Sequence, residues 1–462
     1  GVLSLGGGTT TLAVSNTLGG TSPWTFYNLQ LGNGSAVGTT TPAFTSTTTV
    51  SSRLTIANAH FLDAGDTDWN LSGTGTVFVE TGTFLEDTSR IRYSGNSSNV
   101  LSTQYYDLDI NAAAGTPTYT AVGIGTIVTN DLTVGGTAPT TFNINTNDPL
   151  YDINGDVIVR SNGTLVLSGS AIFRIAGDYD NNGTVTASGG RVTFDGTGAT
   201  TIATGNSSFA NVTVLSTGNV TVTEHATATA NWLLAGATTF GVSSGQALSV
   251  GGQFHNGVAG GVTTWTGSTL RLYGGLDYTI NAATSSDSYA TLDIDDTTQI
   301  RMWSSDASSY SVSSGASLYS QDHAAVDGDL YIWGAYRKTA ASDHWSYNTD
   351  FDGTALGSPR KVDVFFAPSA SVSITGGTLA VYGTSAASTT LQTQGGGNYS
   401  LLVGGNASSS FRYYEVRDIG ANGLTFTGSP TIRTLSNGDS EVSLNGGSAI
   451  TVGGSVINAN PA

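Results

Sequence analysis

Short apolar runs that end in glycine-rich turns recur along most of this chain, and they constrain its fold more than any other feature. Between residues 191 and 274 they follow one another closely, as VTFDG, NVTVLS, NWLLAG, TTFGV, ALSVGG and TLRLYG. With NVTVTEH and TTWTG, which lie between them, a run begins about every 11 residues on average, which is the spacing of short strands joined by turns. This pattern leaves no room for long helices and predicts an all-β chain.

The composition supports the same fold class. The chain of 462 residues has 62 Gly, 28 Asp but five Glu, and 13 Arg but two Lys. Glu and Lys favour helix interiors, whereas Asp hydrogen-bonds to nearby backbone and favours turns. Gly supplies the positive φ angles that tight turns need. We therefore expect many short strands, many turns and almost no helix.

Longer phrases also recur, and they divide the first three quarters of the chain into degenerate repeats of about 80–100 residues. The copies run approximately over 1–89, 90–190, 191–268 and 269–340. Two sets of positions align between stretches that start at Thr76, Ala171 and Ala247: an aliphatic set (Val79, Ile175, Val250) and an aromatic set (Phe84, Tyr179, Phe254).

Two architectures fit these repeats. One is a parallel β-solenoid with coils of ~20 residues, and the other is a series of tandem β-sandwich or jelly-roll domains. We favour the solenoid because no linker separates the copies and because a strand such as RVTFDG belongs equally to both neighbours. Residues 341–462 lack the repeat phrases, so they form either a specialised solenoid end or a separate β-domain.

Charge and cysteine content exclude several function classes. The net charge of −18 and the pI near 4.3 argue against nucleic acid, which requires clustered cations. No stretch approaches the ~18 apolar residues of a membrane-spanning helix. The absence of Cys excludes disulfides and thiolate metal sites. Because the chain opens at Gly1, we interpret it as a processed product or an excised segment, and we expect an extracellular or cell-surface location.

Enzymatic activity is not expected. Parallel β-helices include enzymes that cut acidic polysaccharides, and the fragments that resemble their signatures are Asp295-Asp296 and Asn348-Thr349-Asp350. These fragments occur in the wrong order, and the basic motif is reduced to Arg337-Lys338. With 28 Asp in the chain, pairs of carboxylates arise by accident.

Metal and cofactor binding is not expected either. The segment from Asp178 to Gly183 matches the opening of a calcium loop, but Gly189 stands where the closing Glu belongs, so a turn is the better interpretation. Asp152, Asn154 and Asp156 form a similar, weaker match. The five histidines do not have the spacing of metal ligands (His60, His225, His255, His323, His344).

The two ends of the chain suggest an assembly interface. Written head to tail, the last and first residues reproduce the junction between two internal copies, so the chain begins and ends within one repeat. Copies that stack end to end would complete that repeat and form an open filament. An arbitrary segment of a longer array would look the same. The residues that we assign to this interface are Val2, Leu3, Leu5, Ile450, Val452 and Val456.

The phrases RVTFDGTGATTIATGNSSFANVTV and TLRLYGGLDYTIN resemble those of repetitive bacterial cell-surface and exported β-solenoid proteins of the adhesin or filament type. The resemblance implies an extracellular, non-catalytic role and carries over no functional residue. We therefore expect the subunit of an extracellular bacterial filament or surface fibre whose partners are copies of itself. The alternatives are an adhesin that binds surface glycans through Trp303, Trp333 and Trp345, and a polysaccharide-degrading β-helix enzyme.

Overall fold

The computed structural model confirms an all-β chain, a parallel β-solenoid of about 14 turns. The structure describes residues 3–43, 47–258, 262–273, 277–281, 289–295, 299–303, 310–312, 317–321, 329–333, 335–338, 341–346, 363–366, 371–374, 377–382, 385–386, 388–393, 396–442, 450–453 and 457–458. None of these residues is helical. The chain divides into two compact units, Gly1–Gly218 and Asn219–Ala462.

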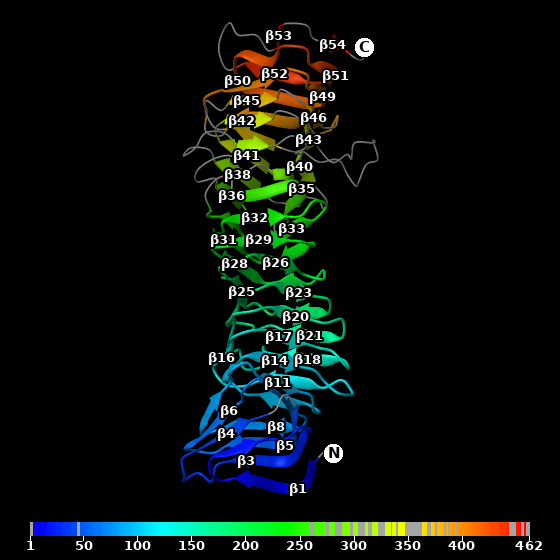
Figure 1. The fold of residues 1–462 in the computed structure, drawn as a ribbon. Coiled ribbons are helices and arrows are strands. Elements are labelled where there is room, and N and C mark those ends of the chain that lie inside the picture. Colours follow the sequence, from blue (N-terminus) through cyan, green and yellow to red (C-terminus); the bar gives the residue numbers. More distant parts are fainter. Residues whose placement is uncertain are drawn as a thin grey trace. The chain divides into compact units, whose positions relative to one another are not determined.

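Four parallel sheets build unit 1, and Figure 1 shows their strands stacked turn on turn. Sheet A contains β1 (Leu3–Leu12), β3 (Trp24–Leu31), β5 (Thr48–Ile56), β7 (Asp68–Leu71), β9 (Phe78–Glu80), β11 (Arg90–Tyr93), β14 (Asp107–Ile110), β17 (Leu132–Val134), β20 (Val157–Val159), β23 (Tyr179–Asn181), β26 (Thr200–Ala203) and β27 (Ser208–Phe209). Sheet B contains β2 (Asn16–Leu18), β4 (Gly38–Pro42), β6 (His60–Asp63) and β10 (Thr83–Leu85).

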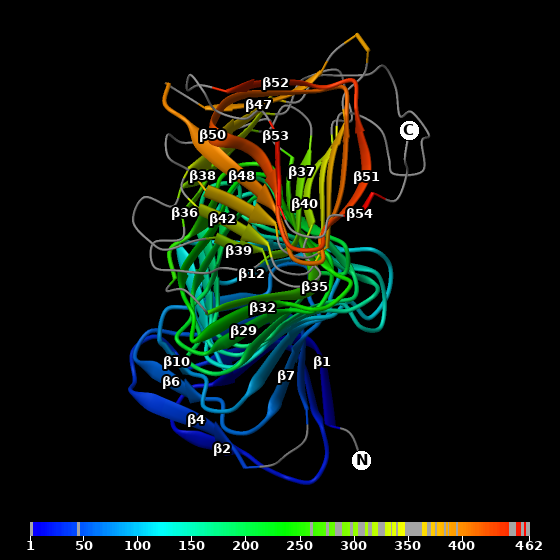
Figure 2. The ribbon, with the colours of Figure 1, turned by 90° about the horizontal axis from the view of Figure 1, so that it is seen from above.

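The other two sheets complete the later turns of unit 1. Sheet C contains β8 (Gly75–Thr76), β12 (Ser98–Val100), β15 (Thr118–Ala121), β18 (Thr140–Asn143), β21 (Gly163–Val166) and β24 (Thr184–Thr186). Sheet D contains β13 (Gln104–Tyr105), β16 (Gly125–Val128), β19 (Leu150–Ile153), β22 (Ile172–Ile175), β25 (Arg191–Phe194) and β28 (Asn211–Leu215). From β11 to β25 each turn therefore has one strand in each of sheets A, C and D. In the first turns the strands of sheet B lie on one side, opposite β1 and β7 (Figure 2).

Unit 2 is also built from parallel strands that pair with strands of the next turn. Its strands are β29 (Asn219–Val222), β30 (Ala226–Ala228), β31 (Trp232–Gly236), β32 (Thr239–Val242), β33 (Ala247–Val250), β34 (Phe254–Asn256), β35 (Thr263–Leu272), β36 (Asp277–Asn281), β37 (Tyr289–Asp295), β38 (Gln299–Trp303), β39 (Tyr310–Val312), β40 (Ser317–Gln321), β41 (Asp329–Trp333), β42 (Ala335–Lys338), β43 (Ala341–Ser346), β44 (Asp363–Phe366), β45 (Ser371–Ile374), β46 (Gly377–Tyr382), β47 (Thr389–Thr393), β48 (Tyr399–Val403), β49 (Ser408–Arg412), β50 (Tyr414–Phe426), β51 (Thr431–Ser436), β52 (Asp439–Val442), β53 (Ile450–Val452) and β54 (Ile457–Asn458). Strands on either side of residue 340 pair in parallel, β40 with β43 and β41 with β44.

Each strand pairs with the equivalent strand one turn later, and the length of a turn varies. Arg92 bonds Asp109 across a step of 17 residues, whereas Arg90 bonds Asp68 across 22. Most strands have two to five residues, and the corners between them differ in length. At one corner, Gly135 has a φ of +93°, and a Cβ there would come within 2.7 Å of the Gly163 backbone, so a side chain cannot be accommodated.

Alternation within each strand builds the core of unit 1. Because successive side chains point to opposite faces, every second residue enters the interior and stacks on its equivalent in the next turn. On sheet A the fully buried row is Trp69, Ile91, Leu108, Leu132, Val157 and Tyr179. On sheet C, Tyr119, Phe142 and Leu165 form such a row, and Phe142 meets Tyr151 of sheet D edge to face at 5.6 Å.

Two buried tyrosines of this core, Tyr93 and Tyr105, are hydrogen-bonded to each other. The hydroxyls of Tyr93 and Tyr105 lie 2.9 Å apart, and Tyr105 Oη donates to the Leu101 carbonyl at 2.8 Å. The amide of Leu101 donates to Tyr93 Oη at 3.3 Å. Burial raises the pKa of Tyr93 to about 12, so the phenol stays neutral. This network holds the corner between β12 and β13.

Truncating the aromatic row tests the packing. Phe142→Ala removes a fully buried ring, and we expect a loss of about 3–5 kcal/mol in unfolding free energy. Urea unfolding followed by circular dichroism measures the loss, and amide hydrogen exchange in β15, β18 and β21 locates it. Ile124→Ala, at a side chain 93% exposed, is the control and should change stability by less than about 0.5 kcal/mol. Equal effects of the two variants would contradict this packing.

Candidate functional site

The outer faces of unit 1 differ in chemistry. Sheet A carries carboxylates and guanidinium groups, such as Asp107 and Arg90. Sheet D is mixed, with Asp152, Arg174 and Arg191 on its strands. None of the residues in the six strands of sheet C is charged. The candidate sites are therefore the acidic edge of sheet A and the hydroxyl-bearing face of sheet C.

The acidic edge is a column of four carboxylates, one per turn: Asp107, Asp131, Asp156 and Asp178. Each stands at the start of a sheet A strand or directly before it. In each, the Oδ1 atom accepts the backbone N–H of the equivalent residue one turn later, with N···O distances of 3.2, 2.8, 2.7 and 2.6 Å, the last donor being Thr201. Asn130 Nδ2 also donates to Asp107 Oδ1 at 2.8 Å.

Within the column, the surroundings of Asp131 oppose its ionisation. Burial raises the pKa of Asp131, and the carboxylates of Asp156 and Asp107 raise it further, while the hydrogen bond from the Asp156 N–H lowers it. Like charges stacked at the strand spacing of about 4.8 Å repel one another. Among the residues that the structure describes, no group of three His, Asp or Glu side chains could hold a metal ion. The column therefore works as a series of backbone clamps between turns.

Two ion pairs cross sheet A: Arg90–Asp68 continues the column beyond Asp107, with which Arg90 pairs in register, and Arg92–Asp109 lies two residues further along the strands. Arg90 makes a two-pronged contact with Asp68, at 3.0 Å from Nε to Oδ1 and 2.7 Å from Nη2 to Oδ2. Arg92 Nε donates to Asp109 Oδ2 at 2.7 Å. Both pairs connect adjacent turns. The Arg90–Asp68 pair is partly exposed and contributes modestly to stability, whereas Asp109 of the second pair is buried.

The calcium-like segment is a strand and a turn. Tyr179 lies in the core, and Asp178 is occupied by the Thr201 N–H. Asn181 is also buried, and its Nδ2 donates to the Thr204 carbonyl at 2.6 Å. In the second segment, Asp156 Oδ1 accepts the Asp178 N–H. The sequence presents these aspartates as two local loops, whereas the fold stacks them in one column.

Asp152 lies outside that column, on sheet D, where it pairs in register with Arg174. Arg174 Nη1 contacts Asp195 Oδ2 at 2.7 Å. Burial raises the pKa of Asp152, Asp195 raises it further, and Arg174 lowers it. Of the histidines, His60 is buried with Nε2 at 2.8 Å from Thr40 Oγ1.

The residues considered for polysaccharide cleavage do not come together among the described side chains. Asp295 ends β37, and Arg337 with Lys338 ends β42, where only the backbone is described. Asp296 and residues 348–350 lie outside the described residues, as does His323. The absence of enzymatic activity stays a prediction.

The aromatic rings proposed for glycan binding also lie beyond the described side chains. Trp303, Trp333 and Trp345 belong to β38, β41 and β43, whose backbone alone is described. Trp69, Trp232 and Trp265 are fully buried. Glycan binding through exposed tryptophans therefore stays a prediction.

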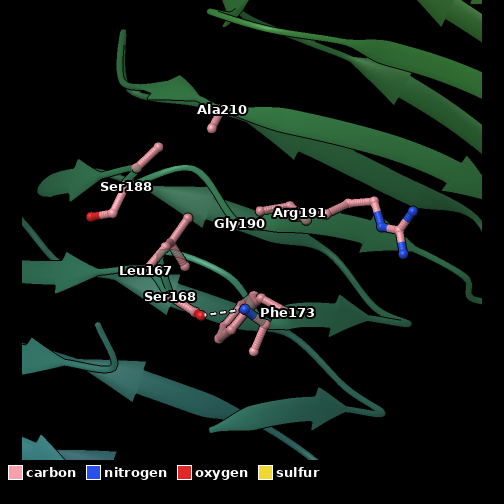
Figure 3. A pocket seen from close by; sticks show the side chains of 10 residues that line it. Leu167, Ser168, Phe173, Ser188, Gly190, Arg191 and Ala210 are labelled. Carbon is pink, nitrogen blue, oxygen red and sulfur yellow. Dashed lines mark hydrogen bonds between the residues drawn. The ribbon is translucent and has the colours of Figure 1, made fainter. Parts of the chain in front are cut away.

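A small crevice opens between two corners of unit 1 (Figure 3). Leu167, Ser168 and Phe173 line it from one turn, and Ser188 and Arg191 from the next. Ser168 Oγ accepts the Ala171 N–H there at 2.7 Å. Its volume is about 10 Å³, which is barely enough for one water molecule. It cannot enclose a sugar or a nucleotide.

Three of the predicted interface residues are exposed ends of core rows. Leu5 pairs in register with the buried Phe26 and is 37% exposed. In unit 2, Ile450 continues the row of Leu424 and Val452 that of Phe426, with 37% and 59% exposure. For Leu3 the backbone alone is described, and Val2 and Val456 lie outside the described residues.

No protein-family model, curated protein or solved structure matches this chain. A search of the described residues for a helix long and apolar enough to cross a membrane found none.

The raised pKa of Asp131 predicts a pH-dependent gain from Asp131→Asn. The native state binds the proton of Asp131 more tightly than the unfolded chain, so its ionisation costs stability at neutral pH. Asparagine keeps the acceptor for the Asp156 N–H and never ionises. We expect the variant to be more stable than the parent at pH 7, with the gain shrinking as the pH falls through the raised pKa toward 3.8. Urea unfolding of the variant and the parent at pH 7 and near pH 3.8 measures this gain in unfolding free energy. A gain that is the same at both pH values would contradict the prediction.

Two substitutions of Asp156 separate a clamp from a cation site. Asp156→Ala leaves the Asp178 N–H without its acceptor and should cost about 1–3 kcal/mol of unfolding free energy. Asp156→Asn retains an acceptor and should cost much less. Urea unfolding with and without calcium measures both. If the column held a cation, asparagine would be as damaging as alanine and calcium would stabilise the parent chain.

Proposed function

We propose that this chain is a non-catalytic structural protein, the subunit of an extracellular bacterial filament or surface fibre. Copies add end to end, so that the solenoid continues from one chain into the next. The observation that carries the proposal is that core rows run out to exposed aliphatic side chains at Leu5, Ile450 and Val452. The side chains that these three contact in register, Phe26, Leu424 and Phe426, are buried.

Backbone pairing supports the same contact. Among the described strands, β1 pairs only with β3, and β53 pairs only with β50. Each strand thus presents one edge of N–H and C=O groups that another parallel strand can pair with. Hydrogen bonding and burial of the aliphatic rows would occur together, and fully burying each such side chain is worth roughly 1.5–3 kcal/mol.

The net negative charge of the chain makes this end-to-end contact depend on salt concentration. A net charge of −18 repels one copy from another, and salt screens that repulsion. End-to-end growth driven by apolar rows should therefore strengthen as salt is added. Association driven by ion pairs would weaken instead, so salt dependence distinguishes the two.

Electron microscopy and sedimentation of the purified chain test the proposal. We expect filaments that lengthen with protein and salt concentration. Leu5→Lys and Val452→Lys bury a charge in the contact and should prevent growth, although each lowers the net negative charge. Ile124→Lys makes the same charge change at a side chain 93% exposed and should leave growth intact. Monomers at all concentrations, or equal loss in the control, would refute end-to-end assembly.

A further inference from the structure

Sheet C presents two straight columns of side chains on its outer face. The first runs through Thr118, Thr141, Thr164 and Thr184, which pair in register on β15, β18, β21 and β24. The second lies two residues further along each strand and contains Thr76, Asn99, Thr120, Asn143, Val166 and Thr186. All are exposed or half-buried, and their inward neighbours, such as Phe142, form the core. Figure 1 shows β18 and β21 within this stack.

The array is both regular and uncharged. Rows repeat at the strand spacing of about 4.8 Å, and columns lie about 6.6 Å apart, two residues along a strand. Threonine is stiff at χ1, so ordering these side chains costs little entropy. The chain has a net charge of −18, so copies of it repel one another. The strands of sheet C carry no carboxylate, so a second copy can approach this face with less repulsion.

We propose that sheet C is the face through which copies of this chain pack side by side. The inference rests on the proposed filament, because it supplies the lateral contact that joins filaments into bundles. A second copy is the partner whose repeat equals that of the array, since both are set by the same strand spacing. Two such faces would interdigitate about 10 Å apart, with hydroxyl groups bonding across the junction.

The size of the face sets the strength of the contact. Six strands extend roughly 25 Å along the stack, so one copy offers only a few hundred Å². A stable complex buries about 800 Å² per partner, so isolated subunits should pair weakly. In filaments the contacts repeat along the length and act together. Lateral packing is therefore expected to follow end-to-end growth.

Single-cysteine variants test the contact directly, because the chain has no cysteine of its own. Thr164→Cys places a thiol at the centre of sheet C. Ile127→Cys, at a side chain 41% exposed on sheet D, is the matched control. A bis-maleimide with a reach of about 10 Å matches the expected separation of the sheets. We expect Thr164→Cys to form cross-linked dimers about tenfold faster than the control in filaments, and detectably faster in concentrated monomer.

A charge on the face supplies the second arm. Thr141→Asp places like charges on the two facing sheets, so in the Thr164→Cys background it should abolish the excess cross-linking. On its own, Thr141→Asp should give single filaments under conditions in which the parent chain gives bundles. Equal cross-linking of the sheet C and sheet D cysteines would overturn the proposal. A second outcome would also overturn it: the parent chain binds insoluble neutral polysaccharide, Thr141→Asp does not, and the sheet C cysteine shows no excess cross-linking. That outcome would identify sheet C as a glycan-binding face.

The two proposals fail separately. If no filaments form under any condition, end-to-end assembly is refuted, and cross-linking in concentrated monomer still decides the role of sheet C. If filaments form and remain single, with equal cross-linking of both cysteines, end-to-end assembly stands and the lateral contact is refuted.

Discussion

The whole structure depends on parallel hydrogen bonding between each strand and its equivalent one turn later. This pairing fixes which side chains stack on one another, so a residue's environment is decided by neighbours about 17–36 positions away in the sequence. It produces both the core rows and the surface columns. Each turn also depends on its neighbours to bury its apolar side chains and to pair its backbone. The exposed side chain of Leu5, at the end of a core row, therefore marks a surface that another strand could cover.

Much of the fold follows from the sequence pattern. Alternating apolar residues and glycine-rich turns predict parallel strands and a solenoid, and the structure confirms both. The longer alignment is less informative, because positions aligned in sequence lie on different sheets. Phe84 is on β10 of sheet B, whereas Tyr179 is on β23 of sheet A. An aromatic residue can fill an inward position on any of the sheets. The recurring sequence phrases therefore indicate where strands and turns alternate, but they do not indicate which sheet a strand belongs to.

The surface columns were harder to predict for a physical reason. Asp131, Asp156 and Asp178 are separated by unequal numbers of residues, because each corner holds a loop of its own length. Only the register shows that they form one column. A signal was present, since Asp131 and Asp156 directly precede apolar strands, but the motif D-x-D-x-N-G at Asp178 relates only residues that are close in sequence. The threonines of sheet C are hidden in the same way among many others.

The carboxylate clamps direct the acidic groups of sheet A toward the chain's own backbone, and the proposed assembly uses the exposed core rows and the uncharged columns of sheet C. The most direct measurement of that account is amide hydrogen exchange in β1 and β53 at low and high protein concentration. End-to-end pairing predicts that exchange slows in these strands at high concentration while amides in interior strands such as β20 are unchanged. Exchange in β1 and β53 that is independent of concentration would contradict it.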